Sequence, residues 1–406
     1  MNYDCNPMKQ NYLVIGASAA GINAVGALRK HDAHSSITCL AQEQEFPYNK
    51  CFLADYLSGT KAEQSLYLKN QSFFDEHSIS LKLGHSVTLI DRVHKKVVCS
   101  NGSVFHYTKL LLAVGSSMHM PPIEGLAGAQ NVFQFYTLND AQSLNDYVRE
   151  HGVKHAVVIG GGLSGLECAD SLQARGVVVT IVEREAHVLP RQITDAAAQF
   201  LHQAIELFGA RLHVNTAVQK VIQTQGKITE VILENGTTIL TDLLICALGV
   251  RPNSALAHGA GLILEHGAVV TNEWLQTSDP DIFAAGDVAL VTDIFTGEKI
   301  RSCSWPDALQ QGTIAATNMS GAKRQYPGTT TMTSTSCFGV KIFVAGAVKD
   351  FSSSYNAKLC TSHKDLFEYV IFLNDIVKGF ISIGKSGNSS MLRQSLLTQT
   401  PYQKRS

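Results

Sequence analysis

The sequence predicts an α/β protein with two three-layer domains, each built on a βαβ unit, and a small α+β domain at the C-terminal end. A strand, a glycine-rich turn and a helix begin near residue 11. The same pattern returns 144 residues later, with Gly160 in the place of Gly16. From about residue 326 the pattern changes to short strands that follow one another directly, which predicts the separate C-terminal domain.

Composition and charge narrow the class of protein. The 406 residues are 45% hydrophobic and carry a formal net charge of −1, so nothing favours nucleic acid or an anionic membrane as a partner. No apolar run approaches the roughly 18 residues that span a bilayer, and the polar N-terminus lacks the apolar core of a secretory signal. Nine cysteines without a CxxC pair, and 15 scattered histidines, predict no metal site. The scattered cysteines fit a reducing compartment, so we expect a cytoplasmic location.

The first βαβ unit is followed by a hairpin and a buried strand. “NYLVIGASAAGINAVGALRK” predicts a strand and a helix with small residues in its first turn, and “SSITCLAQE” predicts the next strand. Residues further on alternate about Asn101-Gly102, which is typical of a β-hairpin. “KLLLAVGSS” predicts a buried strand that ends at Gly115, and the Pro- and Gly-rich segment after it predicts a linker.

The second unit begins with “KHAVVIGGGLSGLECADSLQARGVVVTIVERE”. A further hairpin turns at Asn235-Gly236, and “DLLICALGVRPN” predicts a strand that runs into Gly249. “TSDPDIFAAGDVAL” closes the central region. In the last part of the chain, “FEYVIFLNDIVKGFISIG” predicts a hairpin through Asn374-Asp375, and a short helix follows it.

The first glycine box is Gly16-x-Ser18-x-x-Gly21. Its first glycine permits a tight turn, and its last lets the helix pack closely on the strand. The free N–H groups of the helix N-terminus then face a pyrophosphate. Serine at the middle position still allows close approach of the backbone. The carboxylate that should bind a ribose is absent at Ala41, and Glu43 is the nearest acidic residue.

The second glycine box is complete, with Gly160-x-Gly162-x-x-Gly165 between a strand and a helix. Glu183 ends the next strand, 23 residues after Gly160, where a carboxylate accepts hydrogen bonds from the adenosine ribose. A carboxylate there repels a 2′-phosphate, so the sequence predicts a preference for NADH over NADPH. Two boxes, each between a strand and a helix, make a joint signal that one box alone would not give.

Over residues 11 to about 400 the chain resembles the FAD-dependent pyridine nucleotide–disulfide oxidoreductase superfamily. Besides the boxes, “LLLAVGSS”, “CALGVRPN”, “TSDPDIFAAGDV” and “WPDALQQGTIAATNMSG” are similar to its cofactor-binding stretches. In “TSDPDIFAAGDV” the resemblance implies that Asp287 bonds the ribityl chain of FAD. It implies cofactor contacts at Gly16, Ser18, Ala19, Gly21, Glu43, Lys50, Val87, Ala113, Gly115, Gly160, Gly162, Gly165, Glu183, Gly249, Gly286, Asp287 and Trp305.

The resemblance also implies the order of the domains. It predicts an FAD-binding domain in two parts, at 1–125 and 251–325, interrupted by an NAD-binding domain at 126–250. Residues 326–406 then form the C-terminal domain. The two cofactors implied are FAD and NADH.

The branch of the superfamily depends on Cys51. The paired CxxxxC cysteines and the C-terminal His-Glu pair of glutathione-type reductases are absent. Coenzyme A disulfide reductases, NADH oxidases and NADH peroxidases use one cysteine 35 residues after the first glycine, and Cys51 stands 35 residues after Gly16. Around it, “FPYNKCFLADYLSG” looks more like rubredoxin reductases and the flavin module of NADH-dependent nitrite reductase. The histidine that peroxidases place at position 19 is alanine, which argues against peroxidase activity.

Two catalytic candidates leave alternatives open. Cys51 is either a redox thiol, stabilised as thiolate at a helix start, or a packing residue that borders the flavin. Ferredoxin-reductase relatives often carry a lysine at position 55, paired with a glutamate that corresponds to Glu167. Here position 55 is Asp55, so either two carboxylates meet, raising one of their pKa values, or Lys50 acts as the partner.

The function expected from the resemblance is hydride transfer from NADH to FAD, with electrons passed to a small redox protein of the rubredoxin, ferredoxin or nitrite reductase type. The first alternative is an NADH-dependent disulfide reductase of the coenzyme A disulfide type, or an NADH oxidase, working through Cys51. The second is an NADH-binding flavoprotein sensor resembling apoptosis-inducing factor. A homodimer is a further expectation.

Overall fold

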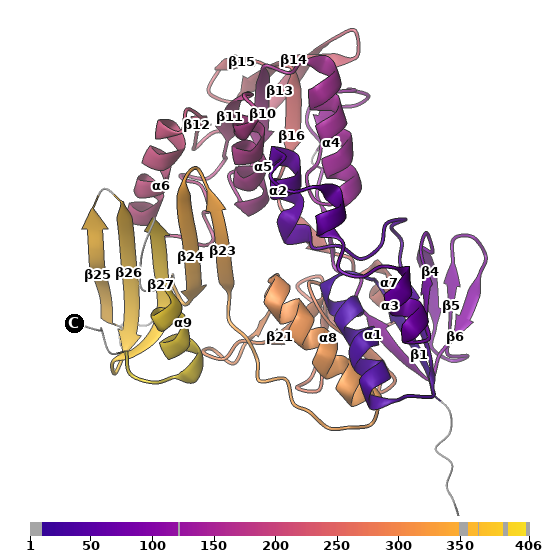
Figure 1. Cartoon of the computed structure of the whole chain (residues 1–406). Helices are drawn as coiled ribbons and strands as arrows, with labels where there is room; N and C mark the ends of the chain where they lie inside the picture. The colour runs from indigo at the N-terminus through magenta and orange to yellow at the C-terminus, as the bar shows by residue number, and fades with distance from the viewer. Residues whose placement is uncertain (1–9, 121, 349–355, 364, 385–388, 403–406) are drawn as a thin grey trace, which may run out of the picture. The chain divides into compact units, whose positions relative to one another are not determined.

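The computed structural model describes residues 10–120, 122–348, 356–363, 365–384 and 389–402 (Figure 1). The chain divides into two compact units. Unit 1 comprises Met1–Asn49, Gln64–Ser117 and Arg251–Thr330, and unit 2 comprises Lys50–Glu63, Met118–Val250 and Thr331–Ser406. The division of the sequence into four domain segments stays a prediction.

The centre of unit 1 is a five-stranded parallel sheet in the order β20-β7-β1-β2-β3. Alternate residues of β1 face opposite layers: Tyr12 and Val14 pack against one core and Leu13 and Ile15 against another. Because both faces are covered, the strand is apolar almost throughout. The strands of this sheet are β1 (Asn11–Ile15), β2 (Ser36–Leu40), β3 (Ile79–Lys82), β7 (Lys109–Leu112) and β20 (Ile282–Ala284).

Helices α1 (Ala19–His31) and α8 (Trp305–Met319) lie side by side on one face of this sheet (Figure 1). They approach so closely that a Cβ on Gly312 of α8 would stand 2.0 Å from the carbonyl oxygen of Ala20. Glycine at that position therefore lets the backbones of the two helices meet.

The other elements of unit 1 frame this sheet. Two small sheets contain β4 (Val87–Asp91), β5 (Lys96–Cys99) and β6 (Val104–His106), and β18 (Leu264–Glu265), β19 (Ala268–Val270), β21 (Ala289–Thr292) and β22 (Lys299–Ile300). The short helices are η2 (Glu63–Leu66), α3 (Gln71–Glu76) and α7 (Ala255–Gly259). Strands β8 (Ser116–Met118) and β17 (Val250–Pro252) pair where the chain passes between the units. The hairpin predicted about Asn101-Gly102 is confirmed as β5–β6.

Unit 2 contains a second parallel sheet, in the order β12-β11-β10-β16-β9. The three-stranded sheet β13-β14-β15 packs on one face, where Val157 and Ile159 of β10 meet Val231 and Leu233 of β14. The elements of this part of unit 2 are β9 (Val132–Phe133), β10 (His155–Ile159), β11 (Val178–Val182), β12 (Arg211–His213), β13 (Val218–Thr224), β14 (Lys227–Leu233), β15 (Thr238–Leu240), β16 (Leu243–Cys246), η1 (Lys50–Phe52), α2 (Leu53–Ser58), α4 (Leu138–His151), α5 (Leu163–Ala174) and α6 (Asp195–Leu207).

The C-terminal part of unit 2 is an antiparallel sheet in the order β23-β24-β27-β26-β25. Helix α9 (Ser389–Thr398) contacts β24 and β27, α6 contacts β26 and β27, and α5 contacts β23. The strands are β23 (Met332–Cys337), β24 (Val340–Gly346), β25 (Asn356–His363), β26 (Leu366–Leu373) and β27 (Ile376–Gly384). The predicted hairpin through Asn374-Asp375 is confirmed, and both residues have the positive φ that its turn requires.

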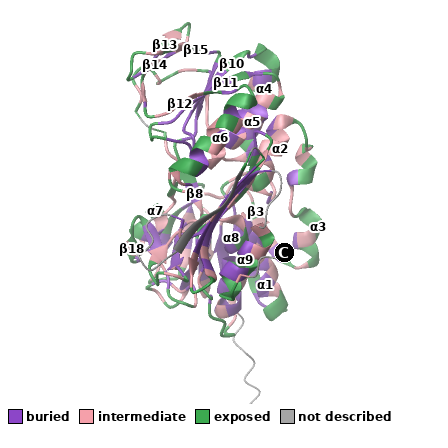
Figure 2. Ribbon diagram, turned by 90° about the vertical axis from the view of Figure 1, so that its left-hand side faces the viewer, coloured by how far each residue is buried: buried purple, intermediate pink, exposed green. Residues whose placement is uncertain are grey.

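The predicted α/β class is confirmed, with two parallel sheets and an antiparallel C-terminal sheet. Figure 2 shows the buried residues concentrated in the strands of the sheets and on the inward sides of the helices. Within the described residues, no helix is both long and apolar enough to cross a membrane.

Candidate functional site

The first glycine box forms the tight turn between β1 and α1. Gly16 has a φ of +105°, and a Cβ there would lie 2.1 Å from the carbonyl oxygen of Ala113, so only glycine fits. A Cβ on Gly21 would lie 1.8 Å from the carbonyl oxygen of Gly16, which explains the close packing of the helix. Ser18 is the N-cap of α1 without a side-chain hydrogen bond, and Ala19 is the buried first helical residue. The turn has the geometry of a phosphate cradle.

Glu43 follows the end of β2 and is held by its neighbours. Its Oε2 accepts a hydrogen bond of 2.7 Å from the hydroxyl of Tyr48, and its backbone carbonyl accepts one from Gly84 N–H. Val87 is buried and begins β4. The carboxylate is thus fixed in place two residues beyond Ala41, in the same unit as the first glycine turn.

Asp287 lies in unit 1, shortly after the end of β20. Its Oδ2 accepts a hydrogen bond of 2.7 Å from the hydroxyl of Ser116, which stands directly after Gly115. The preceding residue, Gly286, has a φ of +80° and donates its N–H to Oε1 of the fully buried Gln311 on α8, at 2.7 Å. These bonds fix the backbone and side chain of Asp287. The strand before Gly115 ends at Leu112, earlier than predicted, and Gly115 itself has a φ of +63°.

The segment before α8 carries a buried polar atom that lacks a hydrogen-bond partner. Trp305 is the first residue of α8, and Cys303, two residues before it, has a φ of +46°. Burial, and then the charge of Asp287, raises the pKa of Cys303 to about 11, while Arg301 lowers it. Within the described residues, the buried Nη1 of Arg301 has no hydrogen-bond partner. A buried guanidinium nitrogen without an acceptor is a place where a ligand oxygen fits.

The residues of unit 1 therefore fit a flavin dinucleotide. The glycine turn and the uncapped start of α1 suit a pyrophosphate, Glu43 suits a ribose, and Asp287 suits the hydroxyls of a ribityl chain. Arg301 offers a donor at the same end of the site.

The second glycine box repeats this construction in unit 2. Gly160 has a φ of +108°, and a Cβ there would lie 2.3 Å from the carbonyl oxygen of Ala247. A Cβ on Gly165 would lie 2.0 Å from the carbonyl oxygen of Gly160, whereas Gly162, the N-cap of α5, faces open space. The open side of the N-cap is where a pyrophosphate approaches in such a turn.

Glu183 lies directly after β11 and is buried. Its Oε2 accepts a hydrogen bond of 2.7 Å from Gly161 N–H, and its Oε1 accepts one of 2.9 Å from Glu185 N–H. Beyond the end of β16 (Leu243–Cys246), Gly249 has a φ of +87°, and its carbonyl accepts a hydrogen bond from His119 N–H. The arrangement fits the adenosine ribose of NADH.

Cys51 lies in η1, one short turn before α2 begins at Leu53. Although the residue keeps exposed surface, burial of the thiol and then the charge of Glu167 raise its pKa to about 11. This is opposite to the thiolate stabilisation that a helix start predicts. The ammonium of Lys50 lies 4.3 Å from the ring centroid of Tyr136, a cation–π contact, and its role as a phosphate contact stays a prediction.

Glu167 lies on α5, two residues after Gly165, and is turned toward β23. Its Oε1 accepts a hydrogen bond of 2.6 Å from the hydroxyl of Thr335. Burial raises its pKa, Asp55 and Asp170 raise it further, and the Thr335 bond acts in the opposite direction. Asp55 is thus one of the groups that raise the pKa of Glu167, and the choice between the two alternatives from the sequence stays a prediction. The alternative in which Lys50 acts as the partner of Glu167 also stays a prediction.

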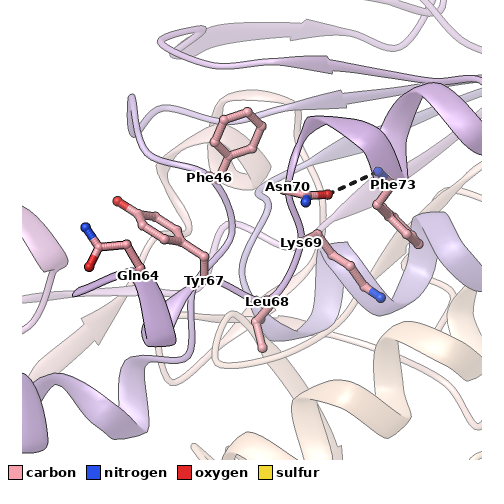
Figure 3. A pocket seen from close by; sticks show the side chains of 7 residues that line it. All are labelled: Phe46, Gln64, Tyr67, Leu68, Lys69, Asn70 and Phe73. Carbon is pink, nitrogen blue, oxygen red and sulfur yellow. Dashed lines mark hydrogen bonds between the residues drawn. The ribbon is translucent and has the colours of Figure 1, made fainter. Parts of the chain in front are cut away.

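A separate surface cavity of about 490 Å³ lies in unit 1 (Figure 3). Two of its polar residues contact Phe73 in the same wall: Lys69 lies 4.2 Å from the ring centroid, and the Asn70 side chain accepts a hydrogen bond from Phe73 N–H. None of the predicted cofactor contacts lines it. The full lining is Phe46, Gln64, Tyr67, Leu68, Lys69, Asn70 and Phe73.

Sequence reasoning missed several residues that hold the candidate site residues in place. Thr335, Ser116, Gln311 and Tyr48 each bond a candidate residue or its neighbour, and Arg301 carries the unpaired nitrogen. Only Ser116 had a local signal, because it adjoins the glycine of “AVGSS”. In the part of the chain that the structure describes, no group of three or more His, Cys, Asp or Glu side chains is arranged to hold a metal ion.

Comparison with known proteins agrees with this geometry. The sequence profile of the family described as pyridine nucleotide-disulphide oxidoreductase matches residues 10–312. An NADH oxidase of Methanocaldococcus jannaschii is 31% identical over 320 residues, which cover 77% of this chain and 71% of that protein. A rubredoxin-NAD(+) reductase of Pseudomonas putida is 31% identical over 340 residues, 84% of this chain and 87% of that protein.

Among solved structures, the covalent complex of putidaredoxin reductase with putidaredoxin contains a similar chain. It matches with a TM-score of 0.87 and 27% identity, over 96% of this chain and 93% of that one. The resemblance inferred from the glycine boxes is thereby confirmed at the level of the superfamily, and both rubredoxin reductase and NADH oxidase are among the relatives.

Proposed function

Because the chain belongs to the pyridine nucleotide-disulphide oxidoreductase family, and is therefore an FAD- and NADH-dependent oxidoreductase, we propose that it passes electrons from NADH to a small redox protein. The single observation that supports this most is the repetition of one construction. Each unit has its own glycine turn, and the acidic residue beyond the next strand is fixed by hydrogen bonds in both units.

The residues of this chain have distinct tasks in that function. Bound FAD and NADH supply the hydride chemistry when present. Glu183 orients the ribose of NADH and disfavours a 2′-phosphate, while Asp287, held by Ser116, orients the ribityl chain. Glu167 is a partly buried carboxyl whose pKa is raised, chiefly by desolvation, which suits it to hold or release a proton.

The acceptor is proposed from the relatives and from Cys51. The rubredoxin-NAD(+) reductase and the putidaredoxin reductase complex carry small redox proteins in their names. A pKa of about 11 keeps Cys51 a neutral thiol at physiological pH, which favours a role for Cys51 in packing over one in exchanging disulfides. Both observations support a redox-protein acceptor.

A second candidate function is supported by one relative. The Methanocaldococcus jannaschii protein is named an NADH oxidase, and Cys51 stands at the spacing of the single-cysteine enzymes. In this alternative, oxygen or a small disulfide accepts the electrons, and Cys51 takes part directly.

The test is anaerobic reduction by NADH followed by an acceptor screen. The purified protein should be yellow, with about one FAD per chain, because one glycine turn and one Asp287 form one flavin site. After reduction, rubredoxin, a [2Fe–2S] ferredoxin, coenzyme A disulfide and oxygen are added separately. Rapid reoxidation by an iron–sulfur or rubredoxin acceptor, unchanged in Cys51→Ser, supports the proposal. Turnover with coenzyme A disulfide or oxygen that Cys51→Ser abolishes establishes the second candidate instead.

A further inference from the structure

Two hydrogen bonds join α5 to the C-terminal sheet. The hydroxyl of Thr335 on β23 donates to Oε1 of Glu167 at 2.6 Å. One helical turn later, Oδ1 of Asp170 accepts a hydrogen bond of 2.8 Å from the backbone N–H of Phe338, just after β23. Both acceptors are carboxylates of the helix that starts at the second glycine turn, and both donors belong to the C-terminal sheet or its first turn.

The surroundings of Glu167 contain acids and thiols. Asp55 comes from α2 and Asp170 from α5 itself, and each raises the pKa of Glu167. Glu167 in turn raises the pKa values of three thiols, Cys51 on η1, Cys168 on α5 and Cys337 on β23. Across the described residues, no salt bridge joins Glu167 to a lysine or an arginine. Thr335 is therefore the group whose hydrogen bond lowers the pKa of this carboxyl.

The two facing carboxyls differ in their environments. The Asp55 side chain is 44% exposed, and its Oδ2 lies 3.7 Å from the ammonium of Lys61. Glu167 is partly buried against β23, where ionisation is disfavoured by desolvation first and by the two acids second. A carboxyl whose pKa is raised by its surroundings in this way is suited to hold a proton.

We propose that Thr335 is a positioning residue for Glu167, through which the C-terminal domain sets the orientation and protonation of the carboxyl on α5. The inference rests on the proposed function, because it gives Glu167 its task there. The hydroxyl can donate to Oε1 whether Oε2 is ionised or protonated, so the side chain keeps one orientation in both states. The bond is stronger with the ionised form, so it favours loss of the proton.

Thr335→Val tests the proposal, since valine keeps the shape of threonine and removes the hydroxyl. The readout is the infrared band of the protonated Glu167 carboxyl, titrated with pH in the holoenzyme and assigned by its absence in Glu167→Gln. We expect Thr335→Val to raise the titration midpoint by about one to two pH units, the range for a hydrogen bond to a charged group. Thr335→Ser should return the midpoint to that of the wild type. The pH profile of flavin reduction by NADH should move in the same direction.

Asp170→Asn is the matched control. Asparagine keeps an oxygen acceptor for Phe338 N–H but removes a charge that raises the pKa of Glu167, so the midpoint should fall. If the substitutions merely loosened the sheet from α5, the titration midpoint of Glu167 would shift in the same direction in both variants. The proposal requires shifts in opposite directions. An unchanged midpoint in Thr335→Val, or a loss of thermal stability alone, overturns the proposal. If NADH fails to reduce the flavin in the wild type, the proposed function fails, but the infrared midpoint still decides the role of Thr335.

Discussion

Glu183 and Gly161 are joined by a hydrogen bond of 2.7 Å from the glycine N–H to Oε2 of the carboxylate. The bond connects the middle of the second glycine turn to the residue that follows β11, so the phosphate turn and the ribose carboxylate are held as one piece. The other oxygen, Oε1, accepts from Glu185 N–H. Each carboxylate oxygen retains a further acceptor position, which leaves room for ribose hydroxyls.

This arrangement predicts that NADH reduces the flavin much faster than NADPH. A charge-assisted contact contributes about 1.5–3 kcal/mol, which corresponds to a preference of roughly ten- to a hundredfold or more in second-order rate constant. Glu183→Gln should narrow the preference, because it removes the charge that repels a 2′-phosphate and keeps one oxygen acceptor. Stopped-flow reduction with both nucleotides measures it.

Glu185→Gln provides the comparison for that experiment, since Glu185 is an adjacent acid whose exposed side chain pairs with Arg184. It should leave the preference close to that of the wild type. Equal rate constants for NADH and NADPH in the wild type would remove Glu183 from its proposed role.

Asp287→Ala should lower the retention of FAD. The substitution removes the carboxylate that fits the ribityl hydroxyls and leaves the Ser116 hydroxyl without its 2.7 Å acceptor. A charged hydrogen bond of this kind contributes about 1.5–3 kcal/mol, so the dissociation constant should rise by roughly ten- to a hundredfold. Ser116→Ala, which loses only the supporting bond, should weaken binding less. Fluorescence titration of the apoprotein with FAD gives both constants, and full retention in Asp287→Ala contradicts the assignment.

The sequence predicts the parts of this protein that depend on local spacing. The glycines at 16, 21, 160 and 165 lie where backbone oxygens exclude a side chain, and the turns at Asn101-Gly102 and Asn374-Asp375 are where their residue types require them. Such features involve neighbours in the chain, so residue type and period are enough to find them.

The sequence alone does not predict contacts between distant segments of the chain. Thr335 lies 168 residues after the Glu167 that it contacts, and no periodic pattern marks one threonine of β23. The effect on Cys51 was also missed, because its helix-start position predicts a low pKa, while burial and Glu167 act the other way. Both depend on how the C-terminal sheet and α2 pack against α5, which is tertiary information.

Gly312→Ala should destabilise unit 1, because the new Cβ would stand 2.0 Å from the carbonyl oxygen of Ala20. To relieve this contact α8 and α1 must separate, and overpacking of this kind typically costs about 1–3 kcal/mol. Gly259→Ala in α7 is the control, since its Cβ would meet nothing within 4 Å. It should be neutral or slightly stabilising. Urea unfolding of the two variants compares them, and equal stabilities would contradict the close approach of the helices.

Glu167→Gln should change how stability depends on pH. Burial raises the pKa of Glu167 above its ordinary value near 4.5. Protonation of Glu167 therefore stabilises the folded protein relative to the unfolded chain. That contribution is complete below the ordinary value and is lost as pH rises through the raised folded value. Glutamine cannot ionise, and its oxygen still accepts from Thr335, so the variant should gain stability over the wild type as pH rises. Chemical unfolding across that range measures the difference, and a constant difference would show that Glu167 does not titrate on folding.

The reactivity of Cys51 gives the last prediction. Its pKa rises from 9.0 to about 11, so at neutral pH it has roughly a hundredfold fewer thiolates than an unperturbed cysteine. Alkylation of Cys51 by iodoacetamide should therefore be slow at pH 7 and should rise about tenfold with each pH unit toward pH 11. In Glu167→Gln the reaction should be faster, since the second cause of the shift is removed, but burial remains the first cause and prevents full recovery.

Peptide mass spectrometry separates Cys51 from the other cysteines, and the fully buried Cys39 serves as the slow reference. The measurement is made on oxidised and on NADH-reduced protein. Slow labelling in both states, with NADH-to-dye electron transfer intact in Cys51→Ser, agrees with a thiol that only packs within the site. Labelling after reduction that is fast at pH 7, with one thiol per flavin, would show a thiolate released from a redox partner. It would make Cys51 the centre of a disulfide- or oxygen-reducing enzyme.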